Sequence, residues 1–276
     1  MDDRSIHGRV GGDFLMNQAV KTEAYTLLTF QPMVDSECTR LILAYHKAPF
    51  VERDHMIGLG SIIGLLRSGN WKLPLVYGNG VKLISPRPVA EHFDSLVPPE
   101  RRLIPTGEPI AAQVEEDWAT YNGGIGAYTA QFAYWHLLPE RKVMTRIFKA
   151  PVPWFERKIT GPLYPLQRLL LNKGLGLSAK GAQEAIDKIR GIIDRTDKRI
   201  ADGRPYLCGD RITLGDPALA SSMSALLKPK GYKPVLPTPE ETPPVLRSAM
   251  EELQQRPTAA FVQRFYDRHA APLIPD

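Results

Sequence analysis

The chain has 276 residues, of which 43% are hydrophobic and 24% charged, a composition typical of a soluble globular protein with one large or two modest domains. Its only two cysteines, Cys38 and Cys208, lie far apart in the sequence, which excludes a disulfide framework and a cysteine-based zinc site. No run of eighteen apolar residues occurs, and the first twenty residues lack a basic segment followed by an apolar one. We therefore expect a soluble, cytoplasmic protein in a reducing compartment.

The formal net charge of +5 is concentrated in one segment of the chain. Between His136 and Lys180 the sequence holds nine Lys or Arg residues but only two Glu residues. Such a segment could face an anionic ligand, an acidic partner or a membrane, but a charged run more often forms a solvated surface. We expect a solvated surface here, with no nucleic-acid partner and little membrane association.

The first expected elements alternate between strand and helix. Residues 1–22 show no periodicity and are expected to form a flexible leader. The β-branched, aromatic and apolar run from Tyr25 to Phe30 predicts a buried strand. Apolar residues recur at helical spacing from Cys38 to Tyr45, and residues 51–54 are suited to a second strand. This is a βαβ unit in outline.

A hairpin around the turn Gly78-Asn79-Gly80 closes the first unit. Before this turn we expect a short helix at residues 61–68 and a strand at residues 72–77. After it we expect the returning strand at residues 81–84 and a closing helix from Val89 onward. The order strand, helix, strand, helix, strand, strand, helix is the thioredoxin-like arrangement, which we assign to residues 23–96. The proline-rich residues 97–109 are expected to form a linker.

The remaining residues, 110–276, are predicted to be entirely helical. One predicted helix carries a stripe of six large apolar side chains, spaced alternately three and four residues apart: Trp118, Tyr121, Ile125, Tyr128, Phe132 and Trp135. Further along, Thr213 begins a Thr-x-x-Asp box before an apolar stretch that ends at Leu227. The Thr213 hydroxyl is expected to accept from the Asp216 N–H, while the Asp216 carboxylate accepts from the Thr213 N–H. This pattern predicts a buried, capped helix.

The motif from Tyr206 to Asp216, Tyr-Leu-x-Gly-Asp-x-Ile-Thr-x-x-Asp, resembles the capped core helix in the C-terminal domain of glutathione transferases. A thioredoxin-like half followed by an all-helical half is also the architecture of that family. The resemblance therefore implies the glutathione transferase fold, an α/β thioredoxin-like N-terminal domain followed by an all-α C-terminal helical bundle. It further implies glutathione as co-substrate, a role in detoxification, no metal, and a homodimer.

In that family glutathione lies against the first domain. Leu73-Pro74 matches the motif whose cis-proline exposes the preceding backbone to the cysteinyl part of the tripeptide, and Lys72 is placed to meet the glycine carboxylate. Where the family has an acid followed by Ser, this chain has Ser85-Pro86, followed by Arg87. Pro86 offers no donor, so Ser85 and Arg87 are the candidates for binding the γ-glutamyl end. A solvated strand-edge position is the alternative for Lys72.

The family's catalytic group lies between the first strand and the first helix, where it meets the glutathione sulfur. Ser36 is the first choice, because the loop Pro32-Met33-Val34-Asp35-Ser36 is similar to the serine loop of bacterial β-etherase-type transferases, which have Asn in place of Asp35. A different alignment puts Met33 at the serine position. Ser36 could equally be a helix N-cap, and Cys38 is a rival nucleophile or a buried small hydrophobe.

A second substrate is expected between the two halves, where Tyr121 and Tyr128 could offer hydroxyl groups to an electrophile, although such an aromatic stripe is more often core. The sequence thus indicates a glutathione transferase-like enzyme that activates the glutathione thiol for attack on a small hydrophobic electrophile. The alternatives are a non-catalytic ligand carrier or scaffold on the same fold and, more remotely, a membrane-associated module that uses the basic segment with Trp154, Phe155 and Tyr164.

Overall fold

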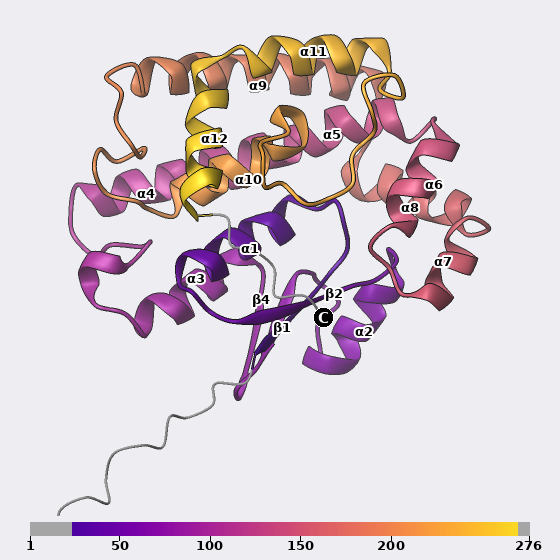
Figure 1. The fold of residues 1–276 in the computed structure, drawn as a ribbon, viewed down its shortest axis with the longest axis horizontal. Helices are drawn as coiled ribbons and strands as arrows, with labels where there is room; N and C mark the ends of the chain where they lie inside the picture. Colours follow the sequence, from indigo (N-terminus) through magenta and orange to yellow (C-terminus); the bar gives the residue numbers. More distant parts are fainter. Residues whose placement is uncertain (1–23, 270–276) are drawn as a thin grey trace, which may run out of the picture.

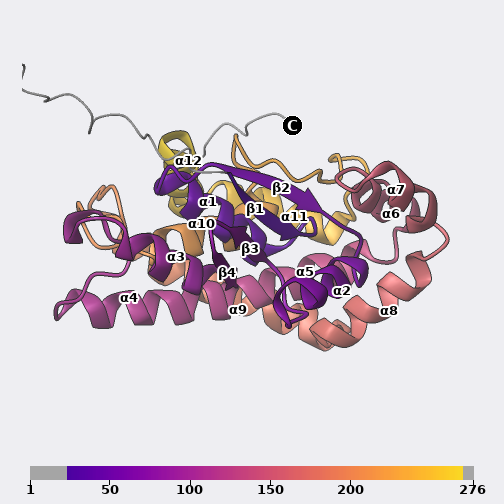
Figure 2. The same cartoon turned by 90° about the horizontal axis from the view of Figure 1, so that it is seen from below.

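The computed structural model describes residues 24–269, and the expected leader at residues 1–22 lies outside this range. A four-stranded sheet with helices α1 to α3 forms one part of the molecule, and helices α4 to α12 form the other (Figure 1). The same arrangement is seen from below in Figure 2, where α5 and α9 run side by side. The predicted order of an α/β thioredoxin-like half followed by a helical half is confirmed.

The sheet begins with the expected βαβ unit. Strand β1 (Tyr25–Thr29) pairs in parallel with β2 (Phe50–Asp54), and helix α1 (Val34–Tyr45) connects them. The central strand β1 is buried on both faces, which accounts for its continuous apolar run. Helix α1 packs on the sheet and also contacts α10, so it lies between the two halves of the molecule.

Two antiparallel strands complete the sheet in the order β2-β1-β3-β4. Helix α2 (Leu59–Ser68) leads to β3 (Leu75–Gly78) and β4 (Val81–Ile84), and α3 (Pro86–Ser95) follows directly. The Leu73–Pro74 peptide bond is cis, as predicted. The Ser85 N–H donates to the Pro74 carbonyl at 3.0 Å, so the start of α3 is joined to the beginning of β3.

The connection between the halves is anchored at both ends. After the 3₁₀ turn η1 (Pro99–Arg101), the buried Asp94 carboxylate accepts from the N–H groups of Leu103 and Ile104, at 2.9 and 2.8 Å. The Leu103 carbonyl in turn accepts from the Leu214 N–H at 2.8 Å, just before α10. These bonds tie the segment to α3 on one side and to the helical half on the other. The expected domain limits themselves remain a prediction.

One long helical run dominates the second half. Helix α4 (Ile110–Trp118) continues through the π-helical stretch η2 (Ala119–Ile125) into α5 (Gly126–Leu137). The glycine-rich residues 123–126 coincide with the end of η2, consistent with the irregular backbone that such a stretch requires. The other helices are α6 (Arg141–Lys149), α7 (Trp154–Thr160), α8 (Tyr164–Leu175), α9 (Ala179–Arg199), α10 (Gly215–Leu227), α11 (Pro244–Gln254) and α12 (Pro257–His269). Among the described residues, no helix is both long and apolar enough to cross a membrane.

Helix α10 is the buried, capped helix that the Thr-x-x-Asp box predicts, but the cap is made differently. The Asp216 carboxylate accepts from the N–H groups of Thr213 and Leu207, both at 2.8 Å. The Asp216 N–H donates to the Thr213 carbonyl, and the Thr213 hydroxyl donates to the Asp216 carboxylate. The reciprocal half of the predicted box is therefore wrong, because the hydroxyl donates where it was expected to accept.

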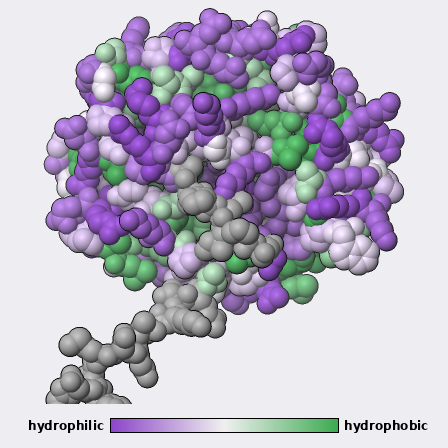
Figure 3. Space-filling view, viewed as in Figure 1, coloured by the Kyte–Doolittle hydropathy of each residue, from purple (hydrophilic) through white to green (hydrophobic). Residues whose placement is uncertain are grey.

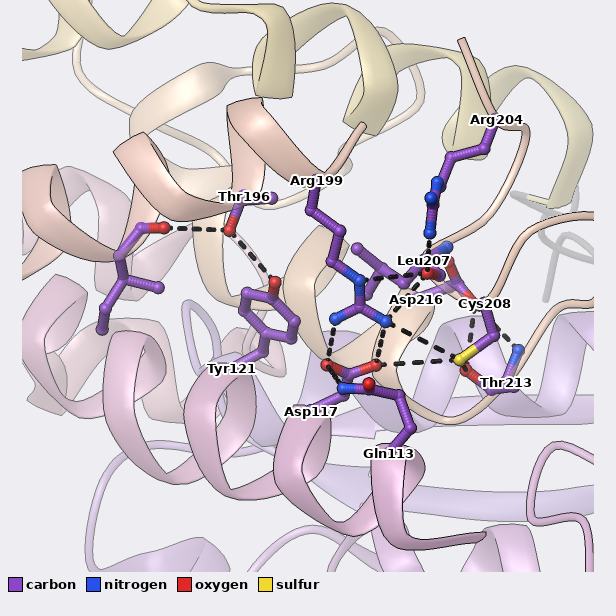
Figure 4. A network of polar contacts seen from close by, with 11 residues as sticks. Gln113, Asp117, Tyr121, Thr196, Arg199, Arg204, Leu207, Cys208, Thr213 and Asp216 are labelled. Carbon is purple, nitrogen blue, oxygen red and sulfur yellow. Dashed lines mark hydrogen bonds and ion pairs between the residues drawn. The ribbon is translucent and has the colours of Figure 1, made fainter. Parts of the chain in front are cut away.

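The cap belongs to a larger polar network (Figure 4). Arg199 of α9 donates to the Asp117 carboxylate and to the Leu207 carbonyl. Gly215 must be a glycine here, because a Cβ at this position would lie 2.6 Å from the Cβ of Asp117. Helices α4, α9 and α10 are thus joined at a single point.

Replacing Asp216 by alanine should lower the free energy of unfolding by about 2 kcal/mol, because two buried N–H groups lose their acceptor. Denaturant midpoints measure the loss. Asp210→Ala, an exposed acid in the same loop, is the control and should stay within about 0.5 kcal/mol of the original protein. Equal midpoints for the two variants would contradict the structural role of Asp216.

Candidate functional site

An apolar cavity of about 350 Å³ lies between the two halves of the molecule. It is bounded by the loop after β1, the first turn of α1, one face of α5, and parts of α8, α10 and α11. The face of α5 that lines it consists mainly of small residues, including Gly126, Ala130 and Ala133. Such a size and lining suit a small hydrophobic ligand.

The first turn of α1 lies at the edge of this cavity. Met33 is the N-cap residue, in an extended conformation with φ −138° and ψ 129°, and no side chain caps the helix. The N–H groups of the first turn have no partner within the helix, and the helix dipole makes them favourable to a negative charge. Met33 also packs against the cluster of Leu28, Leu73 and Leu75, so it lies between the cavity and the Leu73–Pro74 segment.

Two polar contacts hold this turn against α5 and η2. Asn122 donates to the Asp35 carboxylate at 3.0 Å, and Tyr134 donates to the Pro32 carbonyl at 2.8 Å. Burial raises the pKa of Asp35 above its ordinary value, and the Asn122 hydrogen bond opposes that rise.

Ser36 lies inside the protein rather than in the cavity. Its exposed fraction is 0%, and its hydroxyl forms a hydrogen bond with the hydroxyl of Thr29 on β1. In this structure the Ser36 hydroxyl is therefore enclosed and already paired, and its role at a glutathione sulfur stays a prediction. Met33, the residue that the alternative alignment places there, does line the cavity.

Cys38 is also fully buried, and it belongs to the core that α1 forms with the sheet. Burial raises the pKa of its thiol, and the nearby Asp35 carboxylate raises it further. The thiolate is the reactive form of cysteine, so these surroundings are those of a packing residue and not of a nucleophile.

Ser36→Ala should lower the free energy of unfolding by about 1–2 kcal/mol, because the buried Thr29 hydroxyl loses its partner. Any glutathione-dependent activity should change less than about threefold in the same variant, since this hydroxyl does not reach the cavity. Thermal unfolding and initial rates, measured on one preparation, distinguish the two effects. A large loss of activity at unchanged stability would restore Ser36 as a site residue.

The residues expected to bind glutathione lie where β3 begins and β4 leads into α3. Leu73 and Pro74 are buried, and Lys72 is exposed. Ser85 has a φ of 71°, an unusual value for a residue other than glycine, at the point where β4 turns into α3. Arg87, however, donates two 2.6 Å hydrogen bonds to Glu115 and another to Glu91. The positive charge of Arg87 is therefore already paired with these two carboxylates.

Tyr121 and Tyr128, expected at a second-substrate pocket, do not line the cavity. The Tyr121 hydroxyl pairs with the Thr196 hydroxyl of α9 at 3.0 Å, and the Tyr128 ring packs under the ammonium group of Lys188. Both side chains face α9, on the other side of the helical run from the cavity. Sequence analysis did not identify Asn122 and Tyr134 as residues of the site. Each is adjacent in the sequence to a residue of the aromatic stripe, and this position was the signal that could have identified them.

Comparisons with known proteins give a consistent picture of the fold. No protein-family model and no curated protein matches the chain. Among solved structures, a glutathione S-transferase from Sinorhizobium meliloti 1021 is 20% identical, with a TM-score of 0.51 over 91% of this chain and 96% of the other. The glutathione transferase GSTFuA3 from Phanerochaete chrysosporium is 11% identical, with a TM-score of 0.58 over 91% and 100%.

A third structure, a glutathione S-transferase from Methylobacillus flagellatus KT with glutathione bound, is 15% identical, with a TM-score of 0.53 over 90% of this chain and 100% of the other. Identities this low indicate a shared fold, and the overlap includes both halves of the molecule. The chain therefore has the glutathione transferase fold.

Proposed function

We propose that this protein binds glutathione against Leu73, Pro74 and Ser85, where β3 begins and β4 ends, and delivers its thiol to a small hydrophobic electrophile in the cavity. The observation that carries the proposal is the position of the uncapped start of α1, which borders the cavity on one side and packs against the Leu73 segment on the other. A thiol held there would lie within reach of both substrates.

The protein's contribution to the reaction would be to stabilise the thiolate. In place of a serine hydroxyl, we assign this role to the backbone N–H groups at the start of α1, above all that of Val34. These donors and the helix dipole favour an anion, which lowers the pKa of a bound thiol and raises the fraction of thiolate at neutral pH. Positioning both substrates would supply the remainder of the rate increase.

The electrophile class follows from the cavity lining. Apart from Asp35, Asn122 and a few hydroxyl groups, the side chains around the cavity are apolar. Burying a charged substrate there without a partner would be costly. We therefore infer a neutral, largely apolar electrophile. The homodimer and the cytoplasmic location that the sequence suggests remain predictions.

A non-catalytic ligand carrier is the second candidate, and the start of α3 favours it. Pro86 and Pro88 remove two of the N–H groups that the first turn of a helix offers to an anion, and Arg87 is bound to Glu115 and Glu91. The γ-glutamyl carboxylate of glutathione therefore meets fewer donors here, and weak binding is expected.

Conjugation of glutathione to a generic aromatic electrophile at neutral pH separates the two candidates. The proposal requires rates that saturate in both substrates. Ala133→Trp should raise the KM for the electrophile at least tenfold by filling the cavity, with glutathione affinity unchanged within about twofold. Ala112→Trp, an exposed alanine on α4 away from the cavity, is the control. Binding of the electrophile without any conjugation would identify a carrier.

A further inference from the structure

Helix α8 carries leucines on the side that faces solvent. Its inner side is buried through three residues: Tyr164, Gln167 and Leu171. On the outer side Leu166, Leu169 and Leu170 are exposed, Leu166 by 51%. The outer side of a surface helix normally carries charged and polar residues. Packing within the described chain therefore explains only one side of α8.

The neighbouring helices extend this apolar surface. On α7, Trp154 is 69% exposed, and Phe155 and Ile159 are also exposed. On the adjoining side, Leu66 of α2 and Trp71 are exposed by 81% and 70%. The two parts meet where α2 begins, since a Cβ placed at Gly58 would lie 3.7 Å from Leu170. Figure 3 shows hydrophobic side chains at the lower edge of the molecule, where Figure 1 places α2.

Basic residues surround these apolar side chains. From residue 141 to residue 175 the only acid is Glu156, which is fully buried. The same segment contains eight cationic side chains: Arg141, Lys142, Arg146, Lys149, Arg157, Lys158, Arg168 and Lys173. Lys158 lies over the ring of Trp154, with its Nζ 4.8 Å from the ring centre. The exposed aromatic and aliphatic residues of α7 and α8 thus belong to a segment whose exposed charges are all cationic, although Arg146 is paired with Glu241.

We propose that the surface formed by α7, α8 and the exposed residues of α2 docks onto a membrane that contains anionic lipids. Such a membrane suits both the charged and the apolar side chains of this surface. Its headgroups attract Lys and Arg, and its interfacial region accepts Trp, Phe and Leu side chains. A solvated surface explains the cations but not so many exposed leucines and tryptophans. The long basic side chains can lie along the apolar surface with their charges directed to the headgroups.

A second copy of the chain is the less suitable occupant. A two-fold contact through this surface would place the cationic face of one copy, with Arg157, Lys158 and Arg168, against the same face of the other. Like charges opposed across a contact destabilise it, whereas an anionic bilayer neutralises all of them. The charge distribution therefore favours the membrane.

The test is flotation of the full chain with vesicles of phosphatidylcholine and phosphatidylserine, compared with vesicles of phosphatidylcholine alone. We expect binding to the anionic vesicles only, and weaker binding as salt concentration rises. The double variant Leu166→Ser/Leu169→Ser should reduce the bound fraction at least fivefold, because both side chains are exposed and their loss leaves the fold intact. Val245→Ser, an equally exposed residue on α11, is the matched control and should bind as the original protein does.

A second pair of variants tests the charge. Lys158→Glu/Arg168→Glu should abolish binding to anionic vesicles, whereas Lys180→Glu, outside the surface, should have little effect. The proposal is overturned if the protein does not bind anionic vesicles, or binds both kinds of vesicle equally. It is also overturned if the leucine variants leave vesicle binding unchanged. A third contradicting result is that the protein binds no vesicles and the leucine variants convert a dimer into a monomer in sedimentation, which would identify a contact between copies.

Discussion

Val34→Pro should reduce glutathione conjugation about a hundredfold while leaving the protein folded. Val34 is the first residue of α1, where proline is tolerated because its N–H has no partner within the helix. Its predecessor, Met33, already has the extended conformation that a residue before proline requires. The substitution therefore removes a single donor from the proposed thiolate site, and loss of one donor to a stabilised anion costs about 10²–10³ in rate.

The matched control for this variant is Ala179→Pro. Ala179 is also the first residue of a helix, and its predecessor Ser178 is likewise extended, with φ −153° and ψ 160°. Both variants should unfold within about 1 kcal/mol of the original protein, and only Val34→Pro should lose activity. In Val34→Pro the pKa of the bound thiol, followed through thiolate absorbance, should rise. Full activity in this variant would remove α1 from the proposed chemistry.

Glu156→Ala should lower the free energy of unfolding by about 3 kcal/mol. Glu156 of α7 is fully buried, and its carboxylate accepts from the Met56 N–H at 2.6 Å and lies 2.5 Å from Nδ1 of His55. These two residues belong to the loop between β2 and α2, so the contact joins the two halves of the molecule. Removing the carboxylate leaves the buried Met56 N–H and the partly buried His55 ring without this partner, and a buried polar group without a partner costs about 1–3 kcal/mol.

Glu184→Ala provides the comparison for Glu156, because Glu184 is exposed and pairs with an exposed lysine on its own helix. Such a surface pair contributes less than about 1 kcal/mol. Chemical denaturation of both variants should therefore show a large shift for Glu156→Ala and a small one for Glu184→Ala. If the two midpoints agree, Glu156 does not join the halves.

The parts of the fold that local sequence rules govern were predicted well. The strand and helix order and the turn at residues 78–80 depend on short-range patterns, and the structure contains both. The cis peptide bond before Pro74 was predicted from the family resemblance instead, and it is also present. The buried helix after Asp216 was again recognised from a short-range pattern. The direction of the Thr213 hydroxyl hydrogen bond was predicted wrongly, because it depends on how the loop from Tyr206 to Thr213 folds back onto Asp216.

The positions of residues around the cavity were predicted less well, because they depend on which neighbouring element each helix face packs against. In α1 a shift of two or three residues decides between the cavity and the core, and Ser36 lies on the core side with Thr29. The aromatic stripe along α4, η2 and α5 was the most prominent pattern, but its Tyr121 and Tyr128 side chains contact α9. The cavity lies instead beside Gly126, Ala130 and Ala133, whose small size leaves the space. Periodicity indicates that two faces exist and does not identify the partner of each.

The exposed apolar surface of α7 and α8 was likewise not visible from the sequence. Tyr164 was grouped with Trp154 and Phe155, yet Tyr164 is buried and donates to the Leu138 carbonyl, whereas the other two are exposed. From the sequence alone, the leucines at residues 166, 169 and 170 could equally be buried core residues. Only the packing of α8 shows that they point outward.

The most direct test of the proposed function is calorimetric titration of glutathione into the purified protein. The account predicts saturable binding at one site per chain, unaffected by the vesicle-binding variants of α7 and α8. It also predicts that Ser36→Ala binds as the original protein does. No heat of binding at millimolar glutathione, with the protein folded, would contradict the central claim and leave the carrier as the function to pursue.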